Sequence, residues 1–439
     1  MKNIKKVVFS LSMVVLLTAC ARGNNENKQS GNNSNKSSDA ITLVTPKDTS
    51  MLTANCKSYI DDMRAQQEAL EDDPYKYSDL NLYNGVHIED SKYLDTGDPE
   101  GENRTRGKIP DRSDKSMGVD LEFVVQPGHG AEKYTVLVAD NEEFNFAKEL
   151  ETTGNKVNVN NLFVNTTYYW KVISNNEESE VGEFTTGDYP RWISARPLYN
   201  VRDNGGYMTY SGKRVKQGLV YRGGEITSTT NSGHYNTIAD SSKEVFRDVM
   251  KIGVELDLRG ASDIYDGYKA CAFAEDGDID YVQKAIKSYE QTFTQPTNAE
   301  ARQMVRDIFE VFKTADEKPV YYHCFGGADR TGTIGFLLNG LLGVSYTDLV
   351  IDFELTSYSS IDNEHIRCHM PDNTSIGEKH QHSYDRWPAL INQLKTDTTG
   401  GYAWDDDALL MDNIENFLVL ACGVPEATIN TIRDIMLED

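Results

Sequence analysis

The sequence predicts an all-β module followed by an α/β domain in one chain. Before residue 188, apolar and polar residues alternate along several short segments, which is typical of half-buried antiparallel strands. Near residue 320, a short apolar segment, a glycine-rich loop and a longer apolar segment follow one another. This order indicates a buried strand, a turn and a helix. With 439 residues, the chain is long enough for two or three domains.

The composition excludes several classes of protein. Hydrophobic residues make up 38% of the chain, with 24 Tyr, 15 Phe and 4 Trp, which is enough apolar surface for a core and argues against a disordered chain. Lys and Arg number 44 against 69 Asp and Glu, which gives a formal net charge of −25. Because such a chain repels phosphate backbones, we predict no nucleic-acid partner. An anionic ligand must therefore be bound by a local cationic site.

The first 39 residues have the composition of an export signal and a linker. Three lysines precede an apolar run, residues 7–17, that is too short to span a membrane. The run ends in Leu-Thr-Ala-Cys, which resembles the bacterial lipobox, where the cysteine receives a lipid anchor. The resemblance implies a signal peptide at 1–19, a lipidated Cys20 and an exported protein anchored to the outer face of the cell membrane. Residues 20–39 are polar and predict a flexible stalk.

Residues 40–188 form the predicted β module. Three segments place alternate apolar side chains on one face of a strand. These side chains are Leu121, Phe123 and Val125, then Tyr134, Val136 and Val138, then Tyr168, Trp170 and Val172. Segment 162–186 resembles the last strands of fibronectin type III domains, which implies a fibronectin III-like or immunoglobulin-like sandwich. Residues 51–118 are interpreted as an insertion, with a helix at 57–71. We expect a spacer that orients its neighbour, with a ligand-binding module as the alternative.

The chemistry is concentrated in the loop HCFGGADRTG, residues 323–332, between a predicted buried strand at 320–322 and a predicted helix at 333–342. Backbone N–H groups and the positive end of a helix would surround one point there and bind an anion. Arg330 can hold two oxygens of a phosphoryl group, and the same donors favour a thiolate at Cys324. A thiolate in line with a phosphoester can attack phosphorus and form a thiophosphate that water hydrolyses. A structural cysteine in an ordinary turn is the alternative, which the complete motif disfavours.

This loop resembles the signature loop of the cysteine-dependent protein tyrosine phosphatases, in particular the bacterial branch written HCxxGKDRTG. Two further segments resemble that branch: residues 197–225, which begin PLYNVRDNGGY, and residues 253–259, GVELDLR. The resemblance implies an α/β phosphatase domain at 189–439, with a short, mostly parallel sheet flanked by helices and the ligand at the carboxyl ends of the strands.

The resemblance also implies an activity. We expect a phosphatase of tyrosine or dual specificity that needs no cofactor or metal and acts on a phosphorylated protein or a small phosphoester. An inositol polyphosphate or phosphoinositide phosphatase is one alternative, and a surface protein that binds phosphorylated ligands without catalysis is another. Ala328 stands where the branch has a lysine that is linked to phosphoinositide handling. The absence of this lysine favours phosphoproteins or small phosphoesters as substrates.

By the same resemblance, each loop residue has an expected role. Cys324 is the nucleophile, Arg330 clamps the phosphate and Thr331 assists departure of the thiolate. Asp329 matches the proposed general acid and base. The substrate cradle consists of the backbone amides of Phe325, Gly326, Gly327, Ala328, Asp329 and Arg330. His323 is expected to order the loop by hydrogen bonding, and Arg202 and Asp203 are expected to brace it from outside.

Asp257, at the end of a predicted strand, is the competing candidate for the general acid. Its other interpretation is a buried ion pair with Arg259 that ties the strand to its neighbours. A basic cluster lies at Lys213, Arg214 and Lys216. It is interpreted as a solvated hairpin face, with contact to an anionic substrate as the alternative.

Five side chains of the types that bind metals gather between residues 363 and 386. They are His365, Cys368, His369, His380 and His382. Because no second ligand pair follows at a known interval, this segment is interpreted as a polar lid beside the active site, with zinc binding as the alternative.

Residues 298–314 predict an amphipathic helix of the α/β domain. Met304, Ile308, Val311 and Phe312 fall on one stripe of this helix. We expect the stripe to pack against the sheet rather than to bind a partner.

Overall fold

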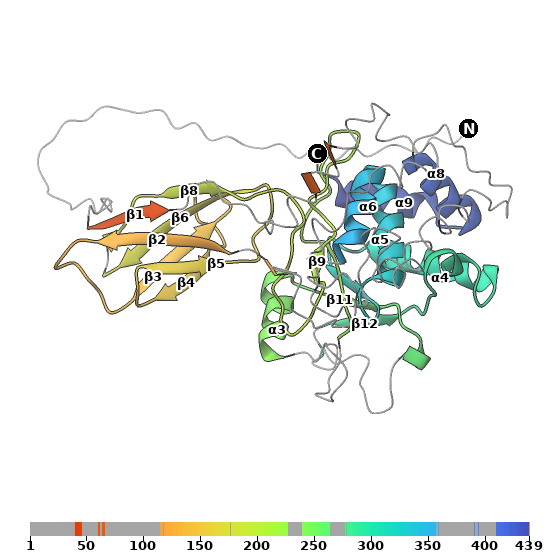
Figure 1. The fold of residues 1–439 in the computed structure, drawn as a ribbon, viewed down its shortest axis with the longest axis horizontal. Helices are drawn as coiled ribbons and strands as arrows, with labels where there is room; N and C mark the ends of the chain where they lie inside the picture. Colours follow the sequence, from red (N-terminus) through yellow and green to blue (C-terminus); the bar gives the residue numbers. More distant parts are fainter. Residues whose placement is uncertain are drawn as a thin grey trace, which may run out of the picture.

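The computed structural model describes residues 40–45, 60–61, 64–65, 115–116, 118–175, 177–226, 239–263, 277, 279–356, 359, 390, 394 and 410–438. They form a β module and an α/β domain that lie end to end (Figure 1). Cys20, the predicted signal peptide and stalk, and most of the 51–118 insertion lie outside the described residues, as do the five side chains between His365 and His382. Within the described ranges, no helix is both long and apolar enough to cross a bilayer.

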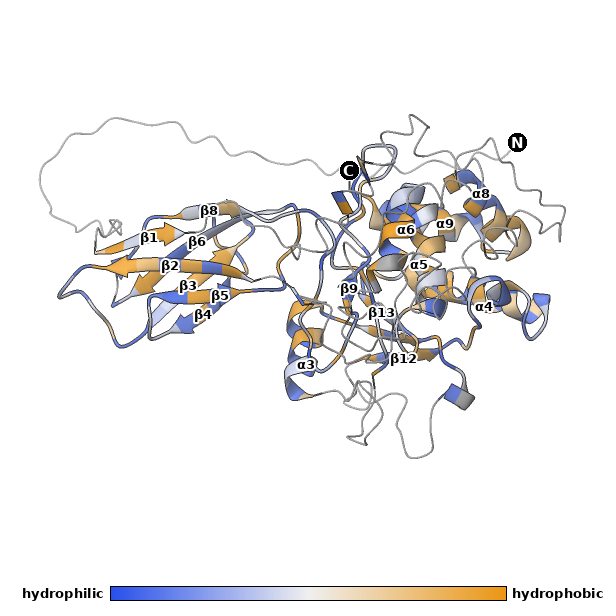
Figure 2. Ribbon diagram, viewed as in Figure 1, coloured by the Kyte–Doolittle hydropathy of each residue, from blue (hydrophilic) through white to orange (hydrophobic). Residues whose placement is uncertain are grey.

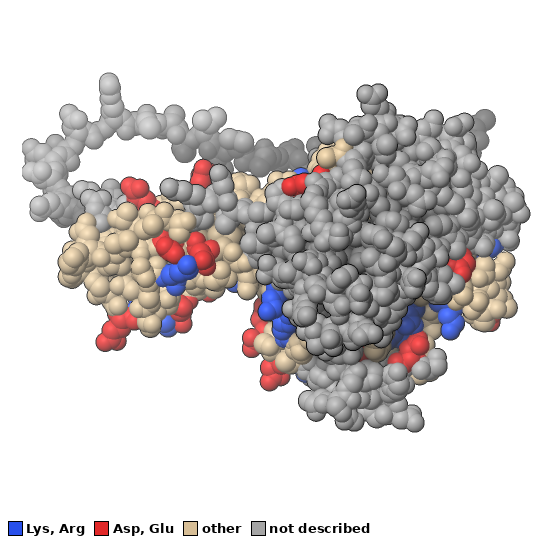
Figure 3. Space-filling model, viewed as in Figure 1, with Lys and Arg blue, Asp and Glu red and all other residues tan. Residues whose placement is uncertain are grey.

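The β module consists of two antiparallel sheets in the part of the chain that the structure describes. One sheet has the order β1-β2-β5, formed by β1 (Ile41–Thr45), β2 (Val119–Val125) and β5 (Lys156–Val159). The other has the order β4-β3-β6-β7, with β8 also paired to β6. Its strands are β3 (Tyr134–Ala139), β4 (Lys148–Thr152), β6 (Thr167–Ser174), β7 (Glu177–Glu178) and β8 (Gly182–Thr185). On the face shown in Figure 3, acidic and basic side chains of this module lie beside one another.

Burial in the β module confirms the predicted alternation. The apolar positions predicted for β3 and β6 are all buried, as are Leu121 and Phe123 of β2. Val125, at the end of β2, is only partly buried and packs against the core. Side chains of both sheets share this core, as expected for a pair of sheets that bury one face each.

The α/β domain is built on a five-stranded sheet with the order β12-β11-β13-β10-β9. Its strands are β9 (Arg202–Asp203), β10 (Val220–Gly223), β11 (Val254–Asp257), β12 (Asp280–Gln283) and β13 (Val320–His323). The last four strands run parallel to one another, and β9 is antiparallel to β10. β13 is central and fully buried, as its apolar sequence predicts. The predicted α/β class, with a mostly parallel sheet, is confirmed.

Helices cover this sheet. They include α3 (Asp240–Glu244), α4 (Asn298–Phe312), α5 (Asp329–Leu341), α6 (Tyr346–Leu355), α8 (Leu410–Asn416) and α9 (Glu426–Met436). α5 contacts the strands β10 and β13 and also the helices α6 and α8, and residues 331–341 are all buried. Figure 2 shows hydrophobic residues concentrated in the strands and in the helices around α5.

The buried face of α4 differs from the predicted stripe. Ile308 and Phe312 are buried as expected, but Met304 and Val311 are only partly buried. The remaining apolar buried positions are Ala301, Val305 and Phe309. The stripe is therefore rotated by about one residue from the predicted one, because the pattern of the sequence does not show where the sheet lies relative to the helix.

Polar contacts join the two bodies. Arg191 donates to the Asp203 carboxylate at 2.6 Å and to the Leu162 carbonyl at 3.1 Å. The side chain of Gln217 exchanges two hydrogen bonds, each of 2.9 Å, with the backbone of Val164. Asp203 was predicted to brace the loop 323–332. The structure corrects this: its carboxylate instead holds the arginine that reaches into the β module.

Candidate active site

The loop 323–332 lies at the carboxyl end of β13, where the sequence predicts it. β13 ends at His323, which pairs with Gly223 of β10 and with Asp257 of β11. The chain then enters α5 at Asp329, four residues earlier than predicted. Asp329, Arg330 and Thr331 consequently belong to the first turn of a helix. The amino-terminal N–H groups and the positive end of this helix face the loop, which favours an anion there.

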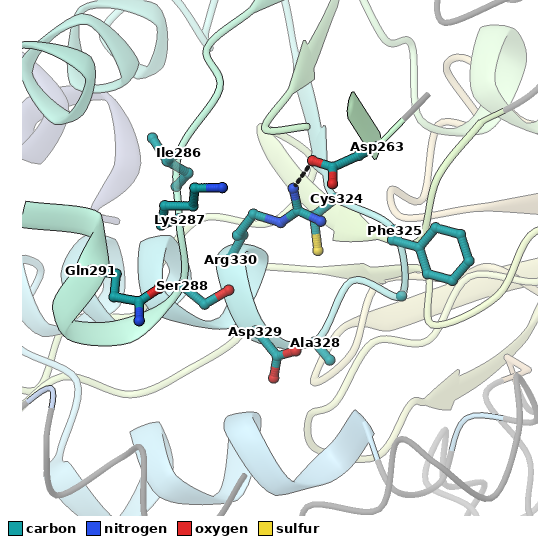
Figure 4. Close-up of a pocket in the computed structure, with 11 residues that line it drawn as sticks. Asp263, Ile286, Lys287, Ser288, Gln291, Cys324, Phe325, Ala328, Asp329 and Arg330 are labelled. Atoms are coloured by element: carbon teal, nitrogen blue, oxygen red, sulfur yellow. Dashed lines mark hydrogen bonds and ion pairs between the residues drawn. The ribbon is translucent and has the colours of Figure 1, made fainter. Parts of the chain in front are cut away.

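A pocket of about 430 Å³ opens over this loop (Figure 4). The loop contributes Cys324, Phe325, Gly326, Ala328, Asp329 and Arg330. Residues from other parts of the chain are Asp263, Ile286, Lys287, Ser288 and Gln291. In Figure 4 the sulfur of Cys324 lies next to the Arg330 guanidinium. Cys324 is 2% exposed and forms no disulfide, so its thiol lies at the bottom of the pocket.

Arg330 is held by a carboxylate that the sequence analysis missed. Its guanidinium donates to Asp263 at 2.6 Å, and Asp263 also accepts the backbone N–H of Gly260 at 2.9 Å. Burial alone would lower the pKa of Arg330, but the charges of Cys324 and Asp263 raise it overall. Burial alone would raise the pKa of Asp263, but the Gly260 N–H and Arg330 lower it. Asp263 follows the carboxyl end of β11 by six residues. A carboxylate so soon after a parallel strand is the feature of the sequence that could have indicated a residue of the site.

Gly327 permits the tight path of the loop. Its φ is +70°, a conformation that residues with a side chain rarely adopt. A Cβ atom at this position would also collide with the carbonyl group of Gly223 on β10. The glycine at 327 is therefore required both for its backbone conformation and for the close approach of the loop to the sheet.

The carbonyl groups of the loop are bound from outside the pocket. Arg222 donates to the Gly327 carbonyl at 3.0 Å, Asn200 donates to the Gly326 carbonyl at 3.1 Å, and the Glu225 N–H donates to the Phe325 carbonyl at 2.9 Å. With three successive carbonyls turned outward, the loop N–H groups are left to face the pocket. Such an arrangement of amides binds an anion.

A buried carboxylate fixes the residues that hold these carbonyls. Asp352 accepts from Arg202 Nε at 2.9 Å and from the Tyr207 hydroxyl at 2.9 Å, and it pairs with Arg222 through its other oxygen. Arg202 also donates to the Asn200 side chain at 2.5 Å. Burial would raise the pKa of Asp352, but the two guanidinium groups lower it overall. The predicted bracing role of Arg202 is confirmed, and it acts through Asn200.

Asp257 lies behind the loop and is not among the residues that line the pocket. It is fully buried, and its carboxylate accepts from Arg259 at 2.8–3.2 Å and from the Tyr281 hydroxyl at 3.0 Å. Burial would raise the pKa of Asp257, but His323 and Arg259 lower it overall. Of the two interpretations of Asp257, the structure shows the buried ion pair with Arg259.

His323 is fully buried and faces away from the pocket. Its Nδ1 lies 3.2 Å from the carbonyl oxygen of Cys324, and its Nε2 lies 3.1 Å from Glu255 Oε1. Burial raises the pKa of Glu255 even though His323 acts in the opposite direction. The two contacts order the backbone at Cys324, as the resemblance implies for this histidine.

Two further residues with predicted roles, Asp329 and Thr331, lie in the first turn of α5. Asp329 lines the pocket and accepts a hydrogen bond of 2.5 Å from the Tyr289 hydroxyl. Thr331 is fully buried and does not line the pocket, and its Oγ1 has no hydrogen-bond partner among the described residues.

The cations around the pocket differ from those singled out in the sequence. The basic cluster Lys213, Arg214 and Lys216 does not contribute to the pocket lining. Lys287, from the segment between β12 and α4, lines it instead. Across the described ranges, no group of three or more His, Cys, Asp or Glu side chains is arranged to hold a metal ion.

The tyrosine phosphatase family model matches residues 193–438 of this chain, which is more than half of its length. The chain belongs to the tyrosine phosphatase family. The matched residues include β9 to α9 and therefore the whole pocket and the loop that carries Cys324. Membership of this family makes the protein a phosphatase-type hydrolase with cysteine-based catalysis.

Among solved structures, this chain is similar to the core catalytic domain of the PP-IP phosphatase SIW14 from S. cerevisiae, solved with citrate. The identity is 15%, the match covers 44% of this chain and 94% of that chain, and the TM-score is 0.24. A putative phosphatase (DUF442) from Shewanella putrefaciens is 12% identical, with 43% and 88% covered and a TM-score of 0.22. No curated protein matches. These TM-scores are low, and the family assignment rests on the sequence match.

Proposed function

We propose that this family member is a phosphomonoesterase that hydrolyses phosphotyrosine in proteins through a covalent intermediate on Cys324. The observation that carries the proposal is the position of the buried Cys324 thiol beside Arg330, at the amino end of α5. A phosphoryl group bound there meets a guanidinium and the loop N–H groups, and its phosphorus faces the sulfur.

The reaction follows from this arrangement in two steps. The Cys324 thiolate attacks phosphorus, the S–P bond forms and the P–O bond to the leaving group breaks, while a general acid protonates the leaving oxygen. Water then attacks the thiophosphate, the same carboxylate accepts a proton from water, and the S–P bond breaks to release phosphate and the thiolate. Arg330 and the loop amides stabilise the negative charge on the phosphoryl oxygens in both steps.

Asp329 is the carboxylate that we propose as this acid and base. It lines the pocket together with Cys324 and Arg330, whereas Asp257 is buried behind the loop and pairs with Arg259. A general acid must reach the leaving oxygen within hydrogen-bond distance. The pocket lining therefore favours Asp329 over Asp257.

An aromatic substrate is favoured by Phe325, which is partly exposed at the pocket. In Figure 4 its ring lies to one side of Cys324, where it can pack against the ring of a phosphotyrosine. An aromatic pair contributes about 0.5–1.5 kcal/mol beyond its buried area. Ala328 itself adds no charge to the pocket lining. Lys287, however, gives the pocket a second cation, which an inositol polyphosphate would also suit.

A substrate panel with EDTA present tests the substrate class. We expect kcat/KM for a phosphotyrosyl peptide to exceed that for the matched phosphoseryl peptide and for inositol hexakisphosphate by about two- to tenfold, as an aromatic contact provides. Phe325→Ala should raise KM for the phosphotyrosyl peptide and leave the phosphoseryl value nearly unchanged. Released phosphate is the readout. A preference for inositol hexakisphosphate, lost in Lys287→Ala, would replace the protein substrate by an inositol phosphate.

We further propose that Cys20 carries a lipid, that the chain is anchored to the outer face of the cell membrane, and that the β module is a fibronectin III-like spacer. The lipobox-like sequence before Cys20 and the polar stretch after it support the anchor. In cells making the wild-type chain, we expect the mature N-terminus to be Cys20 with an added diacylglycerol mass, and Cys20→Ser to lack that mass. An unmodified Cys20 in the wild-type protein would contradict the anchor.

A further inference from the structure

We infer that Tyr289 is a positioning residue for the proposed catalytic carboxylate, fixing Asp329 toward the leaving group through the hydrogen bond from its phenol. This inference rests on the proposed function and adds a residue that the sequence analysis did not single out. Tyr289 begins the short turn η5 (Tyr289–Phe293), which lies between β12 and α4. Its neighbours Ser288 and Gln291 line the pocket, so the turn borders the site directly.

Two contacts connect Tyr289 to the first turn of α5. Its hydroxyl donates to Asp329 Oδ1 at 2.5 Å. Its backbone N–H donates to Thr333 Oγ1 at 3.0 Å, and Thr333 Oγ1 in turn donates to the Asp329 carbonyl at 2.9 Å. The same tyrosine therefore holds Asp329 through the side chain directly and through the backbone by way of Thr333.

The conformation of Tyr289 is unusual for its residue type. Its φ is +54°, in the left-handed region that bulky side chains rarely adopt. The residue is 4% exposed, and its ring meets Phe353 of α6 edge to face at a centroid distance of 6.2 Å. A strained backbone persists only where its surroundings fix it, and such positions cluster at functional sites. The packing fixes the phenol oxygen at the carboxylate before any substrate binds.

The hydrogen bond has two consequences for catalysis. It is made to Oδ1 of Asp329 and restricts rotation of the carboxylate at the pocket. It also stabilises the ionised carboxylate relative to the protonated form, since a donor to a carboxylate favours its charged state. A carboxylate that must give up a proton in one step and accept one in the next needs both a fixed direction and a balanced affinity for protons.

The test compares two aryl substrates that differ in how much their leaving group needs a proton. Phenyl phosphate has a poor leaving group, and p-nitrophenyl phosphate has a good one. In Tyr289→Phe, we expect kcat/KM to fall at least about tenfold more for phenyl phosphate than for p-nitrophenyl phosphate, because general-acid assistance provides about 10²–10⁴-fold. The alkaline limb of the kcat/KM profile should move to higher pH, because the protonated carboxyl persists to higher pH without the phenol.

Tyr281→Phe is the matched comparison. Tyr281 also donates a phenol hydrogen bond to a buried carboxylate, at 3.0 Å to Asp257, and its removal should affect both substrates equally. In the double variant Tyr289→Phe/Asp329→Asn, the extra loss of kcat/KM for phenyl phosphate over p-nitrophenyl phosphate should be no larger than in Asp329→Asn alone. Both changes act on the same carboxyl group, so their effects should not add. A selective loss in Tyr281→Phe, or additive selective losses in the double variant, would overturn the inference.

Inhibition by inorganic phosphate separates positioning from general support of the loop. Tyr289→Phe should keep the wild-type inhibition constant for phosphate, because Arg330 and the loop amides are unchanged. If phosphate inhibition is lost, or if both substrates lose activity equally with an unchanged pH limb, the phenol only supports the loop and the inference is wrong. Absence of Cys324-dependent turnover in the wild-type chain would overturn the proposed function itself.

Discussion

Cys324→Ser is expected to lower kcat for p-nitrophenyl phosphate by at least about 10⁴-fold with EDTA present. A serine hydroxyl ionises far less readily than a thiol, so the variant lacks the proposed nucleophile while the guanidinium and loop amides stay in place. Cys324 is 2% exposed at the bottom of the pocket, and the change of sulfur to oxygen disturbs its packing little. Phosphate release measured at several pH values checks the prediction.

Cys422→Ser is the matched control for this variant. Cys422 is also buried, at 5% exposure, and lies at the end of the turn η7 (Phe417–Ala421), outside the pocket lining. The same chemical change there should leave turnover at the wild-type level. Cys324→Ser should still bind vanadate or phosphate, which shows that the pocket is intact. Wild-type turnover by Cys324→Ser would end the proposal of a covalent intermediate.

Asp352→Asn is expected to lower the free energy of unfolding by about 3–5 kcal/mol, the cost of leaving buried charges without their partner. The Asp352 side chain is 8% exposed, and those of Arg202 and Arg222 are fully buried. Without the carboxylate, both guanidinium groups lose their counter-charge and Arg222 no longer holds the Gly327 carbonyl in a fixed direction. Activity should therefore fall together with stability. Urea unfolding followed by circular dichroism, with phosphatase assays on the folded protein, measures both effects.

Asp280→Asn is the control for the loss of charge. Asp280 pairs with Lys318 at 2.5 Å, but the two side chains are 61% and 54% exposed, so its replacement should cost less than about 1 kcal/mol. A comparable loss of stability in both variants would show that burial of the Asp352 pair is not the cause.

The effect of Asp352→Asn should also depend on pH. The folded protein holds the pKa of Asp352 below that of an ordinary carboxyl, which is about 3.9 in an unfolded chain. The carboxylate therefore contributes its full stability above about pH 4–5, and the contribution is lost as the pH falls through the lowered pKa. The difference between wild type and Asp352→Asn should be constant near neutral pH and shrink in acid.

The loop and its strand could be predicted because their signals are local. The apolar residues before His323 predict a buried strand, and the glycines and Arg330 that follow in the same decapeptide predict a phosphate site. The β strands of the first module follow equally from the alternation of adjacent residues. These features depend on neighbours in the sequence, which a pattern can show directly.

Asp263, Lys287 and Tyr289 could not be predicted in the same way. Each reaches the pocket through the folding of a distant segment: Asp263 meets Arg330 across 67 residues, and Tyr289 meets Asp329 across 40 residues. Asp257 is the opposite case, because its position at the end of a strand suggested a catalytic role and the structure instead buries it with Arg259. Which carboxylate faces the pocket and which is buried with Arg259 depends on the packing behind the sheet, and that information is not local.

The contacts of Arg191 and Gln217 with the β module make the two bodies mechanically dependent on each other. Apolar side chains of the module, such as Val164, belong to the same continuous core as Trp192 and Tyr207 of the α/β domain. Pulling the module away would deprive the buried Arg191 guanidinium, which pairs with Asp203, of its acceptor in the module, the Leu162 carbonyl. The β module and the α/β domain should therefore unfold as one cooperative unit. Tension applied to the N-terminal side would be transmitted to β9, which lies next to β10, the strand whose Arg222 binds the loop 323–332.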